Sequence, residues 1–553
     1  MATPQQITCF GPDFPFDYPT WLTHPAGLAR VPETQQGSEV AIVGAGIAGI
    51  VAAHELMKLG LRPVVYESGR MGGRLRSQRF GAADDVIAEL GGMRFPRSAA
   101  SFFHYVDLLG LRTRPFPNPL TPAAPTTVID LAGKTIHGET LDDLPPLFRE
   151  VADAWNDALE EHASFSTMQA AMRAKDPAAV RAIWSDIVEE WDERTFYDFV
   201  ASAESFRRLT FRHREIFGQV GFGTGGWDSD FPNSMLEILR VVFTAMDEDQ
   251  HLIVGGAEQV VRGLWAHAPA ADELVHWEPG TSLDSLHGGA PRPGVAAIER
   301  DGVSLAVTDR NGVRRCYPAV LVTTQSWLLT TSIDVNEGLF SQDHWMALDR
   351  TRYMQSAKTF VMVDRPFWKD IDPETGKPVM GMTLTDRNTR GTYLFDNGDG
   401  QPAVICLSYS WEGDAAKVLA KSAAQRAQLA LATLEKIYPK TDIRSHVIGE
   451  PITVSWESDP DFLGAFKGAL PGHYRYNRRM YTHFMQDDFP AVHRGIFLAG
   501  DDVSWTPGWA EGAVQTALNA VWGIAAHFDG GADPANPGPG DVWADREPFA
   551  RPN

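Results

Sequence analysis

The residues best suited to chemistry form a glycine-rich turn that is followed at a set distance by an acid. The turn is Val43-Gly44-Ala45-Gly46-Ile47-Ala48-Gly49, a GxGxxG pattern, and Glu67-Ser68 follows by roughly 20 residues. Gly44 permits a tight turn, Gly46 lets backbone approach a pyrophosphate, and Gly49 allows close helix packing. Glu67 can accept hydrogen bonds from ribose hydroxyls. The pattern favours a dinucleotide site over a glycine turn in an unrelated α/β unit.

The elements around this turn have the order that such a site requires. Glu39-Val40-Ala41-Ile42-Val43 is a continuous apolar run, which is typical of a strand buried on both faces. Ile50 to Leu59 continues as a helix whose N-terminus faces the phosphates. A second strand, Pro63-Val64-Val65-Tyr66, ends at Glu67. Strand, turn, helix and acid in this register predict a Rossmann-type unit.

Three further stretches carry glycines, arginines or acids in useful places. Arg70-Met71-Gly72-Gly73-Arg74-Leu75 has two glycines between arginines, which suits it to wrapping around phosphates. Gly495 to Asp502 is typical of a strand that ends in acids, and Trp509-Ala510-Glu511-Gly512-Ala513-Val514 opens a final helix. Together with the glycine turn, and in the same order, these stretches resemble the signatures of the flavin-dependent amine oxidases.

This resemblance implies FAD as the cofactor, with Asp501 binding the ribityl chain and the last helix facing the pyrimidine end of the isoalloxazine. The residues of the glycine turn, together with Glu67 and Ser68, form the first part of the expected cofactor site. The other implied cofactor-binding residues are Gly73, Arg74, Gly91, Gly92, Met93, Arg94, Gly500, Asp501, Trp509, Gly512 and Ala513. Monoamine oxidases that attach flavin covalently have a cysteine near the last segment. Because no cysteine follows Cys406 here, we expect non-covalent FAD.

Two cations, Arg94 and Lys358, are the candidates for catalysis. Glu89-Leu90-Gly91-Gly92-Met93-Arg94 matches the family's loop from the flavin into the substrate cavity. The resemblance implies that Arg94 binds a substrate carboxylate, which would orient the Cα hydrogen. Lys358 matches a lysine that amine oxidases hold by water near flavin N5, where it assists oxygen chemistry. The alternatives are a structural arginine paired with an acid and a surface lysine at a strand end.

Within the family, the resemblance is closest to the bacterial L-lysine 2-monooxygenases and more distant to the tryptophan and phenylalanine 2-monooxygenases. It is carried by FGPDFPF (10–16), GGWDSDFPNS (225–234) and AFKGALPGHY (465–474). It implies that Asp230 meets a distal ammonium between the aromatic walls Trp411 and Phe466, through charge pairing and cation–π contact. The other implied substrate-binding residues are Arg94, Met246, Trp456, Trp505 and Trp509.

Each of these assignments has a plainer alternative. Asp228 and Asp230 can instead cap the following helix, and a tryptophan taken alone is more often core packing. Met246 stands where the lysine enzymes have a cysteine, at the end of Arg240-Val241-Val242-Phe243-Thr244-Ala245-Met246. That departure leaves the balance between oxidase and monooxygenase activity open.

The resemblance implies hydride transfer from the Cα of a free L-amino acid, followed by reaction with O2. L-Lysine is the expected substrate. Oxidative decarboxylation would give the amide, 5-aminopentanamide from lysine, with CO2 and water. Release of the imino acid would give the 2-oxo acid, ammonia and H2O2. L-Arginine, ornithine, tryptophan and a polyamine are alternative substrates, and a non-catalytic flavoprotein is the alternative of another class.

Composition limits the partners. A net charge of −22 opposes association with nucleic acid or an anionic membrane. Cys9, Cys316 and Cys406 have no metal-ligand spacing, so no metal site or disulfide framework is expected. The chain has no signal-like N-terminus and no apolar run of the ~18 residues that a membrane helix needs. We expect a cytoplasmic enzyme, and a homodimer from its N-terminal arm and the resemblance.

The predicted fold class is α/β plus α+β. Helical spacing over Leu141 to Met246, a hairpin signal at Asn311-Gly312 and an amphipathic helix over Ala423 to Ile437 support it. The predicted domains are an extended N-terminal arm (1–37), a discontinuous FAD-binding Rossmann domain (38–93, 250–335 and 490–528), a mixed-sheet substrate domain (94–140 and 336–489), a helical subdomain (141–249) and a loop-like or disordered tail (529–553).

Overall fold

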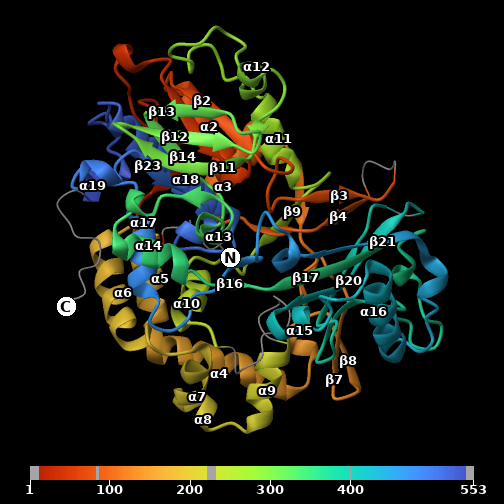
Figure 1. Ribbon diagram of the computed structural model, residues 1–553. Helices are drawn as coiled ribbons and strands as arrows, with labels where there is room; N and C mark the ends of the chain where they lie inside the picture. The colour runs from red at the N-terminus through yellow and green to blue at the C-terminus, as the bar shows by residue number, and fades with distance from the viewer. Residues whose placement is uncertain (1–10, 82–85, 221–231, 399, 544–553) are drawn as a thin grey trace.

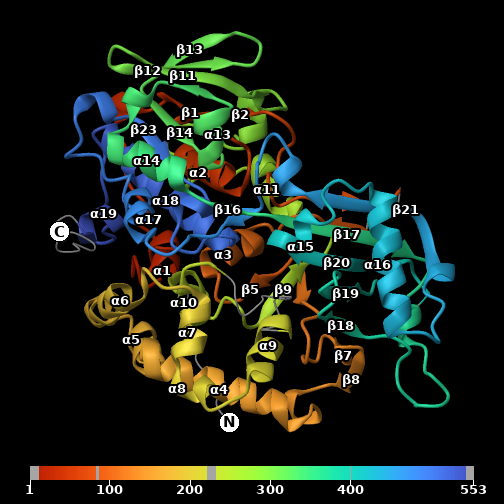
Figure 2. The ribbon, with the colours of Figure 1, turned by 60° about the horizontal axis from the view of Figure 1, so that its bottom comes forward.

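The computed structural model describes residues 11–81, 86–220, 232–398 and 400–543. Its ribbon divides into a parallel sheet with covering helices, a seven-stranded sheet, and a group of helices at the bottom of Figure 1. In Figure 2 the helical group and the seven-stranded sheet lie on either side of two short strands, β5 (Phe95–Pro96) and β9 (Gln250–Ile253). The predicted fold class is confirmed.

The first sheet is wholly parallel, with the strand order β10-β2-β1-β14-β23. Its strands are β10 (Arg292–Pro293), β2 (Arg62–Glu67), β1 (Glu39–Val43), β14 (Ala319–Val322) and β23 (Ile496–Leu498). Successive side chains of β1 face opposite sides. Val40 and Ile42 pack with helices α2 (Ile47–Lys58) and α18 (Ala510–His527). Ala41 and Val43 pack with a β-meander on the other face, so β1 is buried on both faces as predicted.

The meander consists of β11 (Val295–Asp301), β12 (Ser304–Asp309) and β13 (Arg314–Tyr317), which are antiparallel. The hairpin predicted at Asn311-Gly312 therefore joins β12 to β13. Strands of the parallel sheet come from all three segments assigned to the cofactor domain, although the exact domain boundaries stay a prediction. One difference from the predicted domains is β9, which was assigned to the cofactor domain. It pairs with β5 and β6 (Thr113–Pro115), which both belong to the segment predicted for the substrate domain.

The second sheet has the strand order β21-β17-β20-β19-β18-β7-β8. Its strands are β21 (Val447–Ser455), β17 (Ser356–Val363), β20 (Ala403–Trp411), β19 (Gly391–Phe395), β18 (Met382–Thr385), β7 (Thr127–Leu131) and β8 (Lys134–Gly138). Only the pairing of β18 with β7 is parallel among those described. Helix α16 spans Ala423–Ile437, the predicted residues, and begins with a capping box between Ser422 and Gln425.

Helices fill most of the chain between strands β8 and β9, as predicted. They are α4 (Pro146–Ala163), α5 (Phe165–Arg173), α6 (Pro177–Trp191), α7 (Phe196–Ser202), α8 (Glu204–Arg207), α9 (Phe211–Val220) and α10 (Met235–Phe243). The other α-helices are α3 (Ala100–Leu108), α11 (Glu258–Ala266), α12 (Leu283–His287), α13 (Ser326–Thr331), α14 (Gln342–Arg350), α15 (Glu412–Ala416) and α17 (Tyr474–Tyr481). The other strands are β3 (Ser77–Arg79), β4 (Ile87–Glu89), β15 (Asp334–Val335), β16 (Tyr353–Met354) and β22 (Phe466–Lys467).

The N-terminal segment differs from the extended arm that was predicted. From residue 11 onward it packs against its own chain and forms the short helix α1 (Tyr18–Leu22), capped by Asp17. Tyr18 donates a hydrogen bond of 2.7 Å to Asn519 Oδ1 of α18. Asp13 is fully buried and receives two hydrogen bonds from Arg240, of 2.7 and 2.9 Å. Contacts of buried aromatic and charged side chains hold this segment in place. Its sequence has no regular periodicity from which a helix or strand could be predicted.

The C-terminal tail is also more ordered than predicted. A short helix, α19 (Pro539–Trp543), follows the Gly/Pro-rich stretch, and Trp543 is 1% exposed. Its ring lies 5.1 Å from that of Phe14 and 3.1 Å from the guanidinium carbon of Arg181. The tail therefore docks onto the N-terminal segment and α6 through a tryptophan that local composition does not reveal.

The buried ion pair of Asp13 yields a stability prediction. In Asp13→Asn the Arg240 guanidinium stays buried and keeps Glu237 but loses Asp13, and breaking a buried ion pair typically costs about 3 kcal/mol or more. Urea denaturation followed by tryptophan fluorescence measures the change in midpoint. Asp17→Asn is the matched control, because Asp17 only caps a five-residue helix and pairs with an exposed lysine. Equal losses in the two variants would contradict a dominant role for the buried pair.

Candidate active site

The glycine turn lies between β1 and α2, and two of its glycines, Gly44 and Gly49, leave no room for a side chain. Gly44 has a φ of +110°, and a Cβ there would approach Thr323 Oγ1 to 2.7 Å. A Cβ on Gly49 would come within 2.0 Å of the Gly44 carbonyl oxygen. Gly44, Gly46, Ile47 and Ala48 line a cavity, whereas Ala45 and Gly49 form the turn behind it. Because α2 begins at Ile47, its first amides face that cavity.

This cofactor cavity has a volume of about 1500 Å³, counting its opening to solvent. It extends from Glu67 and Ser68, after β2, to Lys358 on β17 and Trp509 before α18. Gly73 lies directly across from the glycine turn, where a Cβ would come within 3.2 Å of the Gly46 Cα. The Gly72 amide also donates a hydrogen bond of 2.9 Å to the Ala45 carbonyl, so the two glycine-rich stretches lie side by side and form one continuous backbone wall of the cavity.

Glu67 stands at the end of β2 with both carboxylate oxygens in use. Oε2 accepts a hydrogen bond of 2.8 Å from the Ala45 amide, and Oε1 accepts one of 2.8 Å from the Gly69 amide. Burial raises the pKa of Glu67 above its usual value. Each carboxylate oxygen has a second lone pair, so the group can also accept from ribose hydroxyls at the cavity wall.

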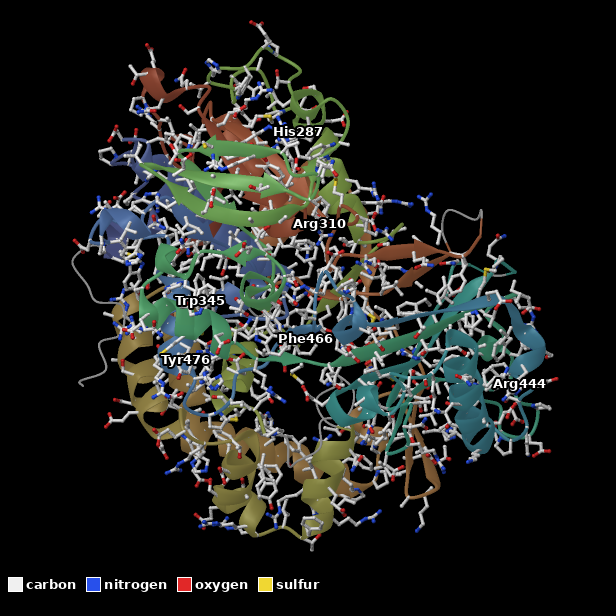
Figure 3. The ribbon with its side chains drawn as sticks, viewed as in Figure 1. His287, Arg310, Trp345, Arg444, Phe466 and Tyr476 are labelled. Carbon is white, nitrogen blue, oxygen red and sulfur yellow. The ribbon has the colours of Figure 1, made fainter. Side chains whose placement is uncertain are left out.

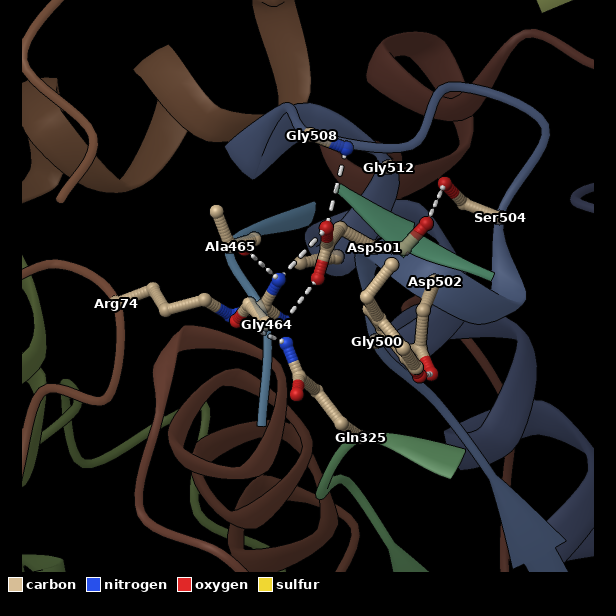
Figure 4. Close-up of polar contacts among 12 residues, drawn as sticks. Arg74, Gln325, Gly464, Ala465, Gly500, Asp501, Asp502, Ser504, Gly508 and Gly512 are labelled. Carbon is tan, nitrogen blue, oxygen red and sulfur yellow. Dashed lines mark hydrogen bonds and ion pairs between the residues drawn. The ribbon is translucent and has the colours of Figure 1, made fainter. Parts of the chain in front are cut away.

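The other end of the chain reaches the cavity through an ion pair (Figure 4). Arg74 bonds both oxygens of Asp501, and its Nη1 also donates to the Ala465 carbonyl at 2.9 Å. The Gly508 amide donates to Asp501 Oδ2 at 3.0 Å. Gly73, Arg74, Gly500, Asp501 and Ala513 line the cavity, whereas Gly512 lies behind it, where a Cβ would meet Ser504 Oγ at 2.3 Å.

Lys358 is 3% exposed and faces the same cavity from β17. Its Nζ donates to the carbonyls of Glu89 and Gly91 and lies 4.7 Å from the ring of Tyr409, its cross-strand partner on β20. Burial lowers the pKa of Lys358 to about 8. A lysine held in this way exchanges its proton close to neutral pH, which a surface lysine does not.

Arg94 follows the Gly91-Gly92 loop and is 9% exposed. Its guanidinium carbon lies 5.6, 5.7 and 5.8 Å from the rings of Phe116, Tyr393 and Tyr409, and Nη1 donates to Asn118 Oδ1 at 3.3 Å. These aromatic faces and the neutral amide orient the guanidinium at the wall of the cavity. The arrangement suits an incoming carboxylate.

A second cavity, of about 1090 Å³ counting its opening, adjoins the first. Gly91, Gly92, Arg94, Lys358, Tyr409, Phe466, Gly508 and Trp509 line both cavities. Trp411 stands at 5.7 Å from the ring of Phe466 and 5.3 Å from that of Tyr409, and completes an aromatic wall. Figure 3 shows Phe466 near the centre of the molecule, where its three parts meet. The second cavity is the candidate substrate site.

Four predicted residues lie elsewhere than expected. Trp505 is fully buried and stacks on Phe14 and Tyr18 at 5.3 and 5.8 Å, so it is a core residue and no cavity wall. Met246 is also fully buried and lines neither cavity. Trp456 lines the cofactor cavity, and Met93 lines the substrate cavity, which reverses their predicted roles. Asp230 lies outside the described residues.

Some residues at the site were not predicted. Tyr409 lines both cavities, and its position two residues before Trp411 on one strand puts the two rings on the same face. Glu237 and Asp247 are acids on the wall of the substrate cavity. Glu237 accepts a hydrogen bond of 2.6 Å from Arg240, three residues further along α10. No sequence signature marks either acid.

The cofactor cavity suits FAD. It offers helix N-terminal amides for a pyrophosphate, Glu67 for a ribose, and an acid and an arginine near the opposite end. Neither described free cysteine, Cys316 or Cys406, lines it. Over the described residues, no group of side chains could hold a metal ion, and no helix is long and apolar enough to cross a membrane.

Comparisons with known proteins agree with this geometry. Residues 47–525 match the family model for flavin containing amine oxidoreductases. A tryptophan 2-monooxygenase of Pseudomonas savastanoi is 31% identical, over 90% of this chain and 91% of its own. The flavin-dependent L-tryptophan oxidase RebO of Lentzea aerocolonigenes is 25% identical, over 88% of this chain and 98% of its own.

A solved structure of putrescine oxidase bound to putrescine shares the fold, with a TM-score of 0.65 and 16% identity, over 88% of this chain and 99% of its own. The names of both curated relatives specify tryptophan, so the predicted closeness to the L-lysine 2-monooxygenases stays a prediction. The chain belongs to the flavin-containing amine oxidoreductase family, and it oxidises an amino acid or amine with FAD as a non-covalently held cofactor.

Proposed function

We propose that the chain is an L-amino-acid 2-monooxygenase with oxidase side activity, and that L-lysine is its substrate. The observation that carries this proposal is the pair of buried cations, Arg94 and Lys358, on the wall that the two cavities share. In this proposal Arg94 binds the carboxylate of the substrate, which makes the ligand an amino acid and not a simple amine. The same contact turns Cα toward the cofactor cavity.

The overall reaction follows from these positions. When bound, FAD accepts the hydride from Cα and delivers electrons to O2. The enzyme consumes one amino acid and one O2 and releases the amide, one CO2 and one water. If the imino acid leaves first, water hydrolyses it, and the products are the 2-oxo acid, ammonia and H2O2.

The chain's own residues position the substrate and control water and protons. Arg94 orients the carboxylate, and the rings of Trp411, Phe466 and Trp509 exclude water from the substrate cavity. Lys358 holds a proton at the wall of the cofactor cavity, where it would assist the reaction with O2. No general base is required, because an amine that enters neutral transfers hydride without one.

L-Tryptophan is the second candidate substrate. The observation in its favour is the name shared by the curated relatives, together with the aromatic wall of the substrate cavity. L-Lysine is favoured by the sequence stretches quoted above and by the two acids on the same wall.

Product analysis under air separates the two candidate substrates. We expect lysine to be turned over fastest, with amide and CO2 in excess of H2O2. A dominant 2-oxo acid would make the chain an oxidase, and a preference for tryptophan would remove lysine.

Replacing Arg94 tests the carboxylate contact. We expect Arg94→Lys to lower kcat/KM for L-lysine by about 100-fold, because an ammonium cannot form the bidentate contact and the misplaced Cα reacts slowly. Oxygen uptake with 1,5-diaminopentane, which lacks the carboxylate, should change little. Arg97→Lys is the control, since Arg97 lies in the same segment but lines neither cavity. An equal loss with both substrates would argue against the contact.

Replacing Lys358 tests the oxygen step. We expect Lys358→Met to lower kcat/KM for O2 by about 100-fold and to leave kcat/KM for the amino acid nearly unchanged. Because the pKa of Lys358 is lowered to about 8, its ammonium is present below that pH and lost above it. In the wild type, kcat/KM for O2 should therefore fall as pH rises through about 8, and the variant should lack this step. A variant that keeps the step would exclude Lys358 as its source.

A further inference from the structure

A third cavity lies outside the substrate cavity and meets it at one acid. It has a volume of about 1790 Å³, counting its opening, and is lined by residues of three segments, 114–123, 247–252 and 394–396. Asp247 lines this outer cavity and also the substrate cavity. Glu248, Asp249 and Asp396 line only the outer cavity. Asp247 thus stands where a solute passing from one cavity to the other would meet it.

A chain of hydrogen bonds fixes the wall between these two cavities. Arg94 donates to Asn118 at 3.3 Å, Asn118 donates to Gln250 at 3.0 Å, and Gln250 donates to the Met246 carbonyl at 2.8 Å. The last residue directly precedes Asp247. The cation that suits a substrate carboxylate and the acid at the junction are therefore held by one hydrogen-bonded chain.

The turn that carries Asp247 is held in an unusual backbone conformation. Ala245 and Asp249, on either side of it, have φ values of +52° and +40°. Non-glycine residues in this region cost roughly 1–3 kcal/mol each and persist only where surrounding contacts impose them. The wall's hydrogen bonds supply such contacts, so the position of Asp247 is set by the fold.

The two acids that line the substrate cavity differ in whether a neighbouring cation balances their negative charge. Glu237 is paired with Arg240, which is itself paired with Asp13. Within the described residues Asp247 forms no ion pair. Burial, with the neighbouring Glu248 carboxylate, raises the pKa of Asp247 to about 7. A cation beside Asp247 would restore its charged form, as an opposite charge does for any buried carboxylate.

We propose that Asp247 is a specificity-determining residue that selects amino acids with a positively charged side chain. Its carboxylate accepts the distal ammonium of a lysine-class substrate at the junction of the two cavities, while Arg94 holds the carboxylate at the other end. The inference rests on the proposed amino-acid oxidation and names the feature that separates lysine from tryptophan. It also gives a role to the one acid on the described wall of the substrate cavity that forms no ion pair with the described residues.

The test compares L-lysine with L-norleucine, which has the same four side-chain carbons but no ammonium. Oxygen uptake gives kcat/KM for both substrates in the wild type, Asp247→Asn and Glu248→Gln, each loaded with FAD. We expect Asp247→Asn to lower kcat/KM for lysine by 10-fold or more and to change that for norleucine by less than two-fold. Glu248→Gln removes the same charge one residue away, outside the substrate cavity, and should leave both values within two-fold.

Several outcomes would overturn the inference. One is a lysine-to-norleucine ratio that Asp247→Asn leaves unchanged, and another is a ratio that Glu248→Gln alters equally. Flavin content and melting temperature identify a variant that merely fails to fold, and Asp247→Glu, which keeps the charge, should retain the preference for lysine. A wild type that oxidises norleucine or tryptophan as well as lysine would refute the role of Asp247 while the proposed function stands. A wild type that oxidises no amino acid would refute the proposed function itself.

Discussion

The ion pair between Arg74 and Asp501 joins residues 427 positions apart in the chain, and both residues line the cofactor cavity. Arg74 follows the second glycine-rich stretch, and Asp501 follows the last strand of the parallel sheet. The pair brings the start of α18 to the glycine turn, and through the Ala465 carbonyl it also holds the strand that carries Phe466. The cofactor wall and the aromatic wall of the substrate cavity are thereby fixed by one contact.

The wall that the two cavities share carries two cations, which the protein holds in different ways. Lys358 is held by backbone carbonyls, and Arg94 contacts aromatic faces and an amide. Elsewhere, as at Asp13 and Arg240, buried charges are closely paired, and there they serve the packing of the N-terminal segment.

The parts of the fold that the sequence predicts are those with local causes. The glycine turn follows from steric demands at Gly44 and Gly49, and α16 begins where a capping box is written into Ser422 and Gln425. The docking of the tail through Trp543 depends on Phe14 and Arg181, which lie far away in the chain. No local pattern carries that information.

The same distinction between local and long-range causes separates the site residues that were predicted from those that were missed. Motif residues such as Gly46 and Asp501 reach the cofactor cavity as predicted from their order. Trp505 does not reach either cavity, because an aromatic residue in an irregular segment has no periodicity to assign its direction, and the core claims it. Asp247 was missed for a related reason: its place at the junction of two cavities depends on the pairing of β9 with β5 and β6.

The interleaving of the parallel sheet has a consequence for biosynthesis. β1 pairs with β14, and β14 pairs with β23, so the sheet gathers strands from the beginning, middle and end of the chain. Such non-local pairing is slow, because long loops must close before any contact is gained. While the chain emerges from the ribosome, the apolar face of α2 lacks α18, its main packing partner, until nearly the whole protein has been made. The nascent protein therefore exposes apolar surface, and is prone to aggregation, until α18 has been made.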